Sequence, residues 1–467
     1  MKKIVYGLVF TAVFAMFIAC SGDDEENGLS AGLYMGDEAI SLDGVAGANI
    51  LLQSLNYLES NAVEGGVYVI ALDADITAEF TPSPGTLKDR GFAGYKDADG
   101  EEIPSPPYLL IDNSKNVTIT LKSSGGQRTI TLGNKGTLLQ VGDAVSTPET
   151  AVTVILENIV LKGLQEGVDG ATEHNNAPLV YVGGGGVLTL REGSAITGNY
   201  HKENQEIRGA GALVRLNGKL ILDGGSITQN TGETTDDNSN GLGGGVCVVD
   251  HDTASFILKK GTVSHNSIVS TTQSARGGGV FVSGGSFIME GGDITENAAK
   301  SANGTAQGGA FGAWVAPKEL YITGGTIADN AALAVNGTAW AVNGMRISGF
   351  TVKLGGNPAI TDAIALGDSA ASIISLDDNF NPAGKITLDF MYGAQPAATA
   401  ENPNPPVPGP STGFGYKDRI HIKWTSGKTD ALPDKFQLGE WLYQIAPFTK
   451  TPIAGSIELA TGKYAQD

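Results

Sequence analysis

The densest group of residues that could do chemistry is Asp250-His251-Asp252, in which two carboxylates flank an imidazole. A glycoside hydrolase needs a pair of carboxyl groups, one of them protonated at the working pH. The three residues fall where other parts of the chain have a Gly-Gly or Asn-Gly corner, so a solvated turn is the alternative interpretation. They are the candidate catalytic residues, and the sequence assigns no catalytic role beyond them.

One segment has part of the pattern of a calcium loop. Asp236, Asn238 and Asn240 alternate with other residues and precede Gly241, as in the first half of such a loop. The position expected to supply a bidentate Glu is Cys247, so the motif is incomplete. We therefore predict no cofactor, with Ca²⁺ at Asp236, Asn238 and Asn240 as the open alternative.

Other catalytic and metal motifs are missing from the sequence. There is no phosphate-binding Walker loop and no Gly-x-Ser-x-Gly nucleophile elbow. The histidines show no paired spacing for zinc: they are His174, His201, His251, His265 and His421. A lyase would need a basic residue beside Ca²⁺-binding carboxylates, but the candidate bases are scattered: Arg191, Arg208, Arg215 and Arg276. Catalysis is thus left open, and a protein without catalysis is favoured.

These residues belong to a repeating chain. A phrase that ends in Ile/Val-x-x-Asn recurs five times, with closing residues Asn199, Asn230, Asn266, Asn297 and Asn330. The regular spacing of these asparagines along the sequence indicates a solenoid. Within one copy, apolar residues alternate in short runs bounded by glycines, which predicts about three short strands per turn and excludes helix. The stacked strands would form an all-β parallel β-helix. We expect each closing Asn to adopt the left-handed conformation and its amide to hydrogen-bond along the stack.

Between each closing Asn and the next Gly-rich opening lies a polar segment of variable sequence. Stacking would place these segments side by side as loops on one flank, where binding faces often lie. The segments are Tyr200–Arg208, Thr231–Leu242, Ser267–Arg276 and Ala298–Gln307.

The clearest copy runs from Gly277-Gly278-Gly279-Val280 to Ile294-Thr295-Glu296-Asn297. It resembles the repeats of bacterial surface proteins with a right-handed single-stranded parallel β-helix, of the pectin-lyase-like superfamily. It is also similar to repeats of polymorphic outer-membrane proteins, although Ile-x-x-Asn replaces their Phe-x-x-Asn and no membrane barrel follows. The resemblance covers roughly residues 110 to 375. It implies the fold, and no catalytic residue is carried over from it.

The first residues have the pattern of an export signal. Met1-Lys2-Lys3 is followed by a short apolar run that ends in Phe17-Ile18-Ala19-Cys20, which resembles a bacterial lipobox. Cys20 is therefore the predicted lipidation site, and the acidic stretch from Ser21 to Glu26 the start of a tether. This places the chain at the bacterial outer membrane, held by a lipid, with outward display as an option. The remaining cysteine, Cys247, lies in an apolar strand and is expected to be buried.

The sequence divides into five parts. We predict a signal peptide at 1–19, an acidic tether at 20–45, and a cap with first strands at 46–109, including a helix within Asn49–Ser60 and a strand at Gly66–Leu72. The β-helix is expected at 110–380, followed at 381–467 by a Pro-rich excursion and a small β-rich C-terminal cap.

The chain is acidic, with 50 Asp and Glu against 30 Lys and Arg. Nucleic acid is excluded as a partner, since binding phosphates requires clustered basic residues. The same charge would repel a polyuronate unless Ca²⁺ bridged the carboxylates.

The expected function is binding, adhesion or display at the cell surface through the stacked loops. The contact surface would include His201, Trp314 and Trp340, and the ligand a glycan or a host or surface protein, bound by a monomer. A polysaccharide lyase or glycoside hydrolase on the same fold is the alternative, and a structural spacer is a third.

Overall fold

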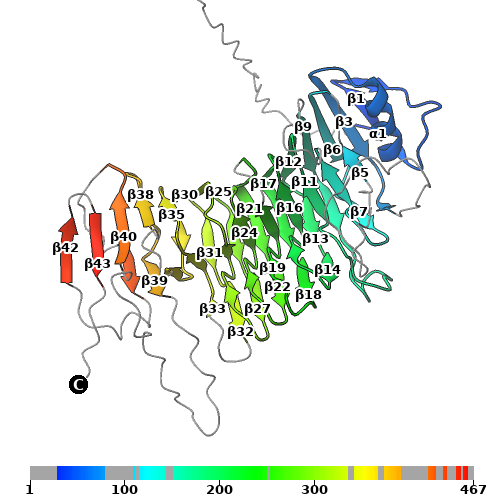
Figure 1. Cartoon of the computed structure of the whole chain (residues 1–467). Helices are drawn as coiled ribbons and strands as arrows, with labels where there is room; N and C mark the ends of the chain where they lie inside the picture. The colour runs from blue at the N-terminus through cyan, green and yellow to red at the C-terminus, as the bar shows by residue number, and fades with distance from the viewer. Residues whose placement is uncertain are drawn as a thin grey trace, which may run out of the picture.

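The protein is a parallel β-solenoid, as the repeats predict (Figure 1). The computed structural model describes residues 29–78, 109–111, 115–142, 151–249, 253–334, 341–366, 373–390, 419–426, 435–438, 449–453 and 456–460. Within these residues almost all regular structure is β-strand, with one α-helix. From β3 (Gly66–Leu72) to β37 (Ile364–Leu366) each coil contributes three strands to the solenoid wall, the last two coils contribute two described strands each, and neighbouring wall strands are parallel. The predicted fold class is confirmed.

One wall is an 11-stranded parallel sheet among the described residues, with one strand from each coil. In order along the stack its strands are β5 (Leu109–Ile111), β8 (Leu139–Val141), β11 (Val180–Val182), β16 (Ala212–Arg215), β20 (Val246–Val249), β24 (Val280–Ser283), β29 (Phe311–Ala313), β34 (Met345–Ile347), β37 (Ile364–Leu366), β39 (Ile386–Phe390) and β41 (Phe436–Leu438).

The other two walls are two rows of one large sheet. The first row is β3 (Gly66–Leu72), β6 (Val117–Ser123), β9 (Val152–Glu157), β12 (Gly186–Arg191), β17 (Lys219–Thr228), β21 (Ser255–Ser264), β25 (Ser286–Met289), β30 (Glu319–Ile322), β35 (Thr351–Leu354), β38 (Ile373–Leu376) and β40 (Arg419–Trp424). The second row is β4 (Ile76–Ala78), β7 (Arg128–Leu132), β10 (Ile159–Lys162), β13 (Ala195–Thr197), the second halves of β17 and β21, β26 (Asp293–Thr295), β31 (Thr326–Ala328) and β36 (Ala359–Ile360). The parallel stack therefore extends beyond both predicted limits, residues 110 and 380.

Inward-facing side chains of successive coils lie on top of one another. One row in register includes Leu220, Phe256, Phe287 and Leu320, all essentially buried. The rings of Phe256 and Phe287 stack with centroids 5.4 Å apart. Because every coil buries its apolar side chains against the next, the core is continuous along the solenoid and no coil has a core of its own.

The closing asparagines form a buried ladder, as predicted. The side-chain amide of Asn230 donates to Oδ1 of Asn266 (3.0 Å), and Asn266 donates in the same way to Asn297 (3.0 Å). The ladder continues through Asn330 and ends at Asp362, which accepts from Asn330 at 2.7 Å. Each carboxamide both donates and accepts, so it satisfies buried polar groups of two coils at once.

The left-handed conformation lies one residue before the position predicted. Gln229, His265, Glu296 and Asp329 have φ between 56° and 59°. Each directly precedes a ladder asparagine and turns the chain, which leaves the asparagine side chain free to point into the ladder. The expectation that asparagine itself adopts the left-handed region is wrong.

The Gly-rich openings are required by close backbone packing. Gly277 has φ +67°, and a Cβ at Gly278 would lie 2.5 Å from the backbone carbon of Ala298. The first glycine makes the corner and the second allows two chain segments to touch.

The segments predicted as flank loops are strands. In the middle coils they pair in parallel and form two small sheets that project along one edge of the solenoid (Figure 1). One sheet is β14 (Tyr200–Glu203), β18 (Thr231–Thr234), β22 (Ser267–Ser270), β27 (Ala298–Ser301) and β32 (Ala331–Ala334); the other is β15 (Ile207–Arg208), β19 (Gly241–Leu242), β23 (Ala275–Arg276), β28 (Ala306–Gln307) and β33 (Ala341–Val342). We call them the flank sheets. The predicted stacking on one flank is confirmed, but the loop assignment is wrong.

Antiparallel strands lie at both ends of the solenoid, and a helix packs at the N-terminal end (Figure 1). At the N-terminal end β1 (Gly32–Met35) pairs with β2 (Glu38–Ile40) and β3, and α1 (Ile50–Asn61) packs Leu51 and Leu58 inward. Asn49 caps the helix by accepting from the Leu52 N–H at 3.0 Å. At the other end β43 (Ser456–Ala460) pairs antiparallel with β40 and with β42 (Thr449–Ile453). Both predicted caps are present; the C-terminal strands extend the first row, with β42 as its outermost described strand.

Candidate functional site

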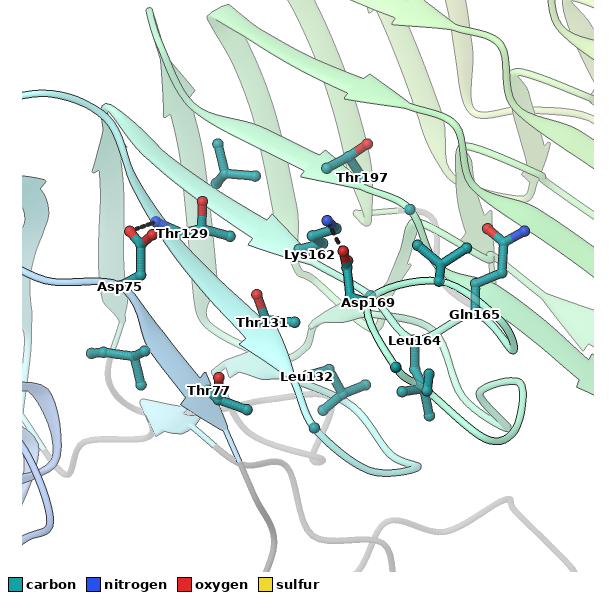
Figure 2. Close-up of a pocket in the computed structure, with 18 of the residues that line it drawn as sticks. Asp75, Thr77, Thr129, Thr131, Leu132, Lys162, Leu164, Gln165, Asp169 and Thr197 are labelled. Atoms are coloured by element: carbon teal, nitrogen blue, oxygen red, sulfur yellow. Dashed lines mark hydrogen bonds and ion pairs between the residues drawn. The ribbon is translucent and has the colours of Figure 1, made fainter.

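A groove of about 1020 Å³ lies on the outer surface of the second row, near its N-terminal end (Figure 2). Strands β4, β7, β10 and β13 form its floor, and residues 163–171 after β10 form a wall. In β7, Ile130 and Leu132 point into the core, so Thr129 and Thr131 point outward. The solenoid register thus brings together residues that are far apart in the sequence.

Each of the four floor strands presents a polar side chain to the groove. Thr77, Thr131, Lys162 and Thr197 are partners on neighbouring strands, so their side chains form one row about 4.8 Å apart. Thr129 lies in the adjacent row, opposite Val160. Side-chain amides add further donors and acceptors around the groove, from Gln127, Gln165 and Gln229. The row can exchange hydrogen bonds with an elongated ligand rich in hydroxyl groups.

The walls mix apolar and charged side chains. Val168 is 40% exposed beside the polar row, whereas the lining residues Ile76, Leu132 and Leu164 are only 9%, 2% and 5% exposed and belong to the core. Lys162 forms an ion pair with Asp169, drawn in Figure 2. The other groove carboxylate accepts a hydrogen bond, from the Thr129 N–H to Asp75 at 2.9 Å. Among the described lining residues, both carboxylates are therefore already engaged by donors.

A cluster of aromatic and charged side chains holds the wall in place. The Tyr200 N–H donates to the Leu164 carbonyl (3.1 Å), and the Tyr200 ring lies 4.1 Å from the His174 ring, centroid to centroid. The Glu166 N–H donates to Nδ1 of His174 at 3.3 Å. Through these contacts residues 163–174 are attached to the first strand of the flank sheets.

The same cluster is unsuited to proton transfer at neutral pH. The Tyr200 hydroxyl donates to Glu233, which also pairs with Lys202 at 3.0 Å. Burial, together with the bond and charge of Glu233, raises the pKa of Tyr200. Burial acts to raise the pKa of Glu233, but bonds from Tyr200 and Lys202 outweigh it, so that pKa is lowered. Tyr200 thus stays protonated and Glu233 ionised, which makes the cluster an anchor.

The strongest catalytic candidates of the sequence, Asp250, His251 and Asp252, lie outside the described residues, as do Cys20 and Trp340. They stay predictions.

The calcium candidates lie between β18 and β19 and are partly engaged. Asp236 accepts from the Ser239 hydroxyl, and Oδ1 of Asn240 accepts from the Ser274 N–H at 3.2 Å. Asn238 is exposed in the same turn. No cluster of three or more His, Cys, Asp or Glu side chains fit to hold a metal ion occurs in the part of the chain that the structure describes.

Other residues singled out by sequence have different environments. His201 is only 1% exposed, so its predicted place on the contact surface is wrong; it fills the interior of the flank sheets because its strand turns that side inward. Trp314 is 56% exposed, as that prediction requires. Cys247 is buried, as predicted. The arginines are not gathered: Arg191 pairs with Glu157, and Arg208 with Glu206.

The comparisons with known proteins give no family for the chain. No protein-family description matches it, and no curated protein or solved structure is significantly similar to it. In the described residues, no helix has the length and apolar character needed to span a membrane.

Proposed function

We propose that the protein is a lipid-anchored surface protein that binds a neutral saccharide in the groove and does not change it chemically. The observation that carries this proposal is the row Thr77, Thr131, Lys162 and Thr197 beside the exposed apolar side chain of Val168. A sugar has hydroxyl groups around its edge and apolar C–H groups on its faces, so it matches both parts of the lining. The two groove carboxylates and one lysine disfavour a polyanion.

The state of the groove carboxylates supports binding over catalysis. Hydrolysis of a glycoside needs one carboxylic acid that gives a proton and a second carboxylate. In the groove Asp75 and Asp169 each already have a donor. The alternative is a polysaccharide lyase or glycoside hydrolase on a pectin-lyase-like fold, with Asp250 and Asp252 as its candidate catalytic residues. Assays for reaction products distinguish such an enzyme from a binding protein.

A Thr129→Val, Thr131→Val double variant tests the groove. Valine keeps the shape and β-propensity of threonine but removes two hydroxyl groups, so affinity for a neutral oligosaccharide is expected to fall about 10-fold. Titration calorimetry with the best ligand of a neutral oligosaccharide panel measures the change. Thr295→Val is the matched control, because Thr295 occupies the same outward row on β26, outside the groove. Equal losses in both variants, or no loss in either, would contradict the proposed site.

The lipid anchor is part of the proposal and has its own test. A Cys20→Ser variant is expected to lose incorporation of a fatty-acid label and to leave the membrane fraction, because lipidation of Cys20 is the only proposed attachment. Cys247→Ser is the control and should stay labelled, since Cys247 is buried in the solenoid. Labelling that persists in Cys20→Ser would exclude Cys20 as the modified residue.

A further inference from the structure

A second cluster, away from the groove, joins two arginines and an exposed aromatic ring. Arg276 of β23 lies over the indole of Trp314, 4.6 Å from its guanidinium carbon to a ring centroid. Its Nε donates to Oε1 of Gln307 at 3.0 Å. Arg346 of β34 donates to the same oxygen at 3.1 Å. Two guanidinium groups therefore meet on one neutral acceptor, which places two positive charges side by side.

The described part of the chain does not neutralise the charge of Arg276 by an ion pair. Among the described residues no carboxylate lies within ion-pair distance of Arg276, and its buried Nη1 has no hydrogen-bond partner there. Glu206 is the nearby carboxylate, and it pairs with Arg208 at 2.7 Å. Burial is the largest cause that lowers the pKa of Arg276 to about 10, and the positive charge of Arg346 acts in the same direction. The negative charge of Glu206 acts to raise this pKa, but its effect is smaller. A buried donor without an acceptor is costly, so an anion placed here would be stabilised.

The ring beside this charge is open to solvent. Trp314 is 56% exposed and Val315 is 59% exposed. Both follow β29, at the coil where the outward row of bulky side chains Cys247 and Phe281 ends in Gly312. A Cβ at position 312 would lie 2.7 Å from the Gly277 nitrogen, so the backbone at Arg276 and Gly277 packs directly against Gly312. Large exposed aromatic rings commonly mark binding surfaces.

We propose that Arg276, Arg346 and Trp314 form a binding site for the carboxylate of an acidic sugar. The carboxylate would accept hydrogen bonds from both guanidinium groups, and the apolar face of the sugar ring would pack on the indole. The net charge of the chain, −20, does not prevent this. At physiological ionic strength, charges farther away than about 8 Å are largely screened, so the local arginines decide. The site is separate from the groove and independent of the proposed function.

Matched sugars with and without the carboxylate test the proposal. The probes are 3′-sialyllactose against lactose, and an unsulfated chondroitin tetrasaccharide against its carboxyl-reduced form, titrated into the purified protein at low and physiological salt. At least one acid is expected to bind about 10-fold more tightly than its neutral twin, with affinity falling as salt rises. Equal binding of acid and neutral twin, or no binding of either acid, would overturn the proposal.

Variants then locate the site. Arg276→Gln and Trp314→Ala are each expected to weaken binding of the acid about 10-fold, a loss of one good charged contact. Trp314 is exposed, so that variant keeps the test valid where Arg276→Gln fails to fold. Arg191→Gln, which removes a surface arginine that pairs with Glu157, and the groove double variant should bind the acid as the wild type does. Acid binding that survives both Arg276→Gln and Trp314→Ala would place it elsewhere and refute the site.

Discussion

An Asn266→Ala variant is expected to lose roughly 4 kcal/mol of unfolding free energy, from several buried groups left unsatisfied. Oδ1 of Asn266 accepts from the backbone N–H of Asn230 (3.1 Å) and from its side-chain amide (3.0 Å). Its own amide donates to the Ile227 carbonyl (2.9 Å) and to Asn297. Alanine makes none of these bonds. The donors and acceptors that lose the Asn266 side chain as a partner are buried, where water cannot take its place.

Denaturant unfolding followed by circular dichroism measures this loss. Asn303→Ala is the control, because Asn303 is exposed in a turn of the flank sheets, and its effect should stay within about 0.5 kcal/mol. The two variants remove the same chemical group, so the difference between them reports the ladder. A stability of Asn266→Ala within about 1 kcal/mol of wild type would mean that the ladder is not needed to hold the coils together.

The second large effect is a loss of stability in acid that depends on His201. Burial lowers the pKa of His201 to about 4, although bonds to the backbone of Gly209 and Asn176 act in the opposite direction. The native state thus keeps the ring neutral while the unfolded chain binds a proton near pH 6.5. Stability is expected to fall by about 3 kcal/mol as pH drops from about 7 to 4, with no further contribution from this group below pH 4.

A His201→Ile variant isolates that contribution. Ile268 occupies the equivalent place two strands further along the same sheet, so isoleucine suits the site. Carboxyl groups with shifted pKa, such as Glu203, Glu233 and Asp362, also titrate in acid, but they are common to both proteins. The difference in unfolding free energy between wild type and variant should change with pH between 7 and 4. A constant difference over that range would show that His201 is not held neutral.

The architecture can be predicted because the residues that make it repeat. The ladder requires one asparagine per coil at a fixed place, so Asn199, Asn230 and Asn266 stand out in the sequence by their spacing alone. The helix at Ile50–Asn61 is likewise predictable, from the helical spacing of its apolar residues.

The flank sheets cannot be recognised in the same way. Their interior is built from small residues such as Ala299, Ala306 and Ala332, and one of their strands has only two residues per coil. Such segments carry little hydrophobic alternation, so they look like polar loops. Pairing with the coil above and below, which a single repeat does not reveal, makes them strands.

The groove cannot be predicted from the sequence either, because it depends on how the coils stack. Thr129 and Thr131 are ordinary outward residues of a strand, and threonine is common on such surfaces. Only the register between coils places them beside Thr77 and Lys162, and only the folded wall at residues 163–171 turns that surface into a groove. No local motif signals an arrangement that depends on three or four coils.

Whether the groove binds a neutral saccharide without converting it is tested by one titration with two readouts. The purified protein is mixed with a panel of neutral oligosaccharides in the calorimeter, and the same samples are then assayed for new reducing ends and for ultraviolet absorbance of unsaturated products. We expect saturable heat with at least one saccharide and no product from any of them. Product formation, or no heat across the whole panel, would contradict the proposal.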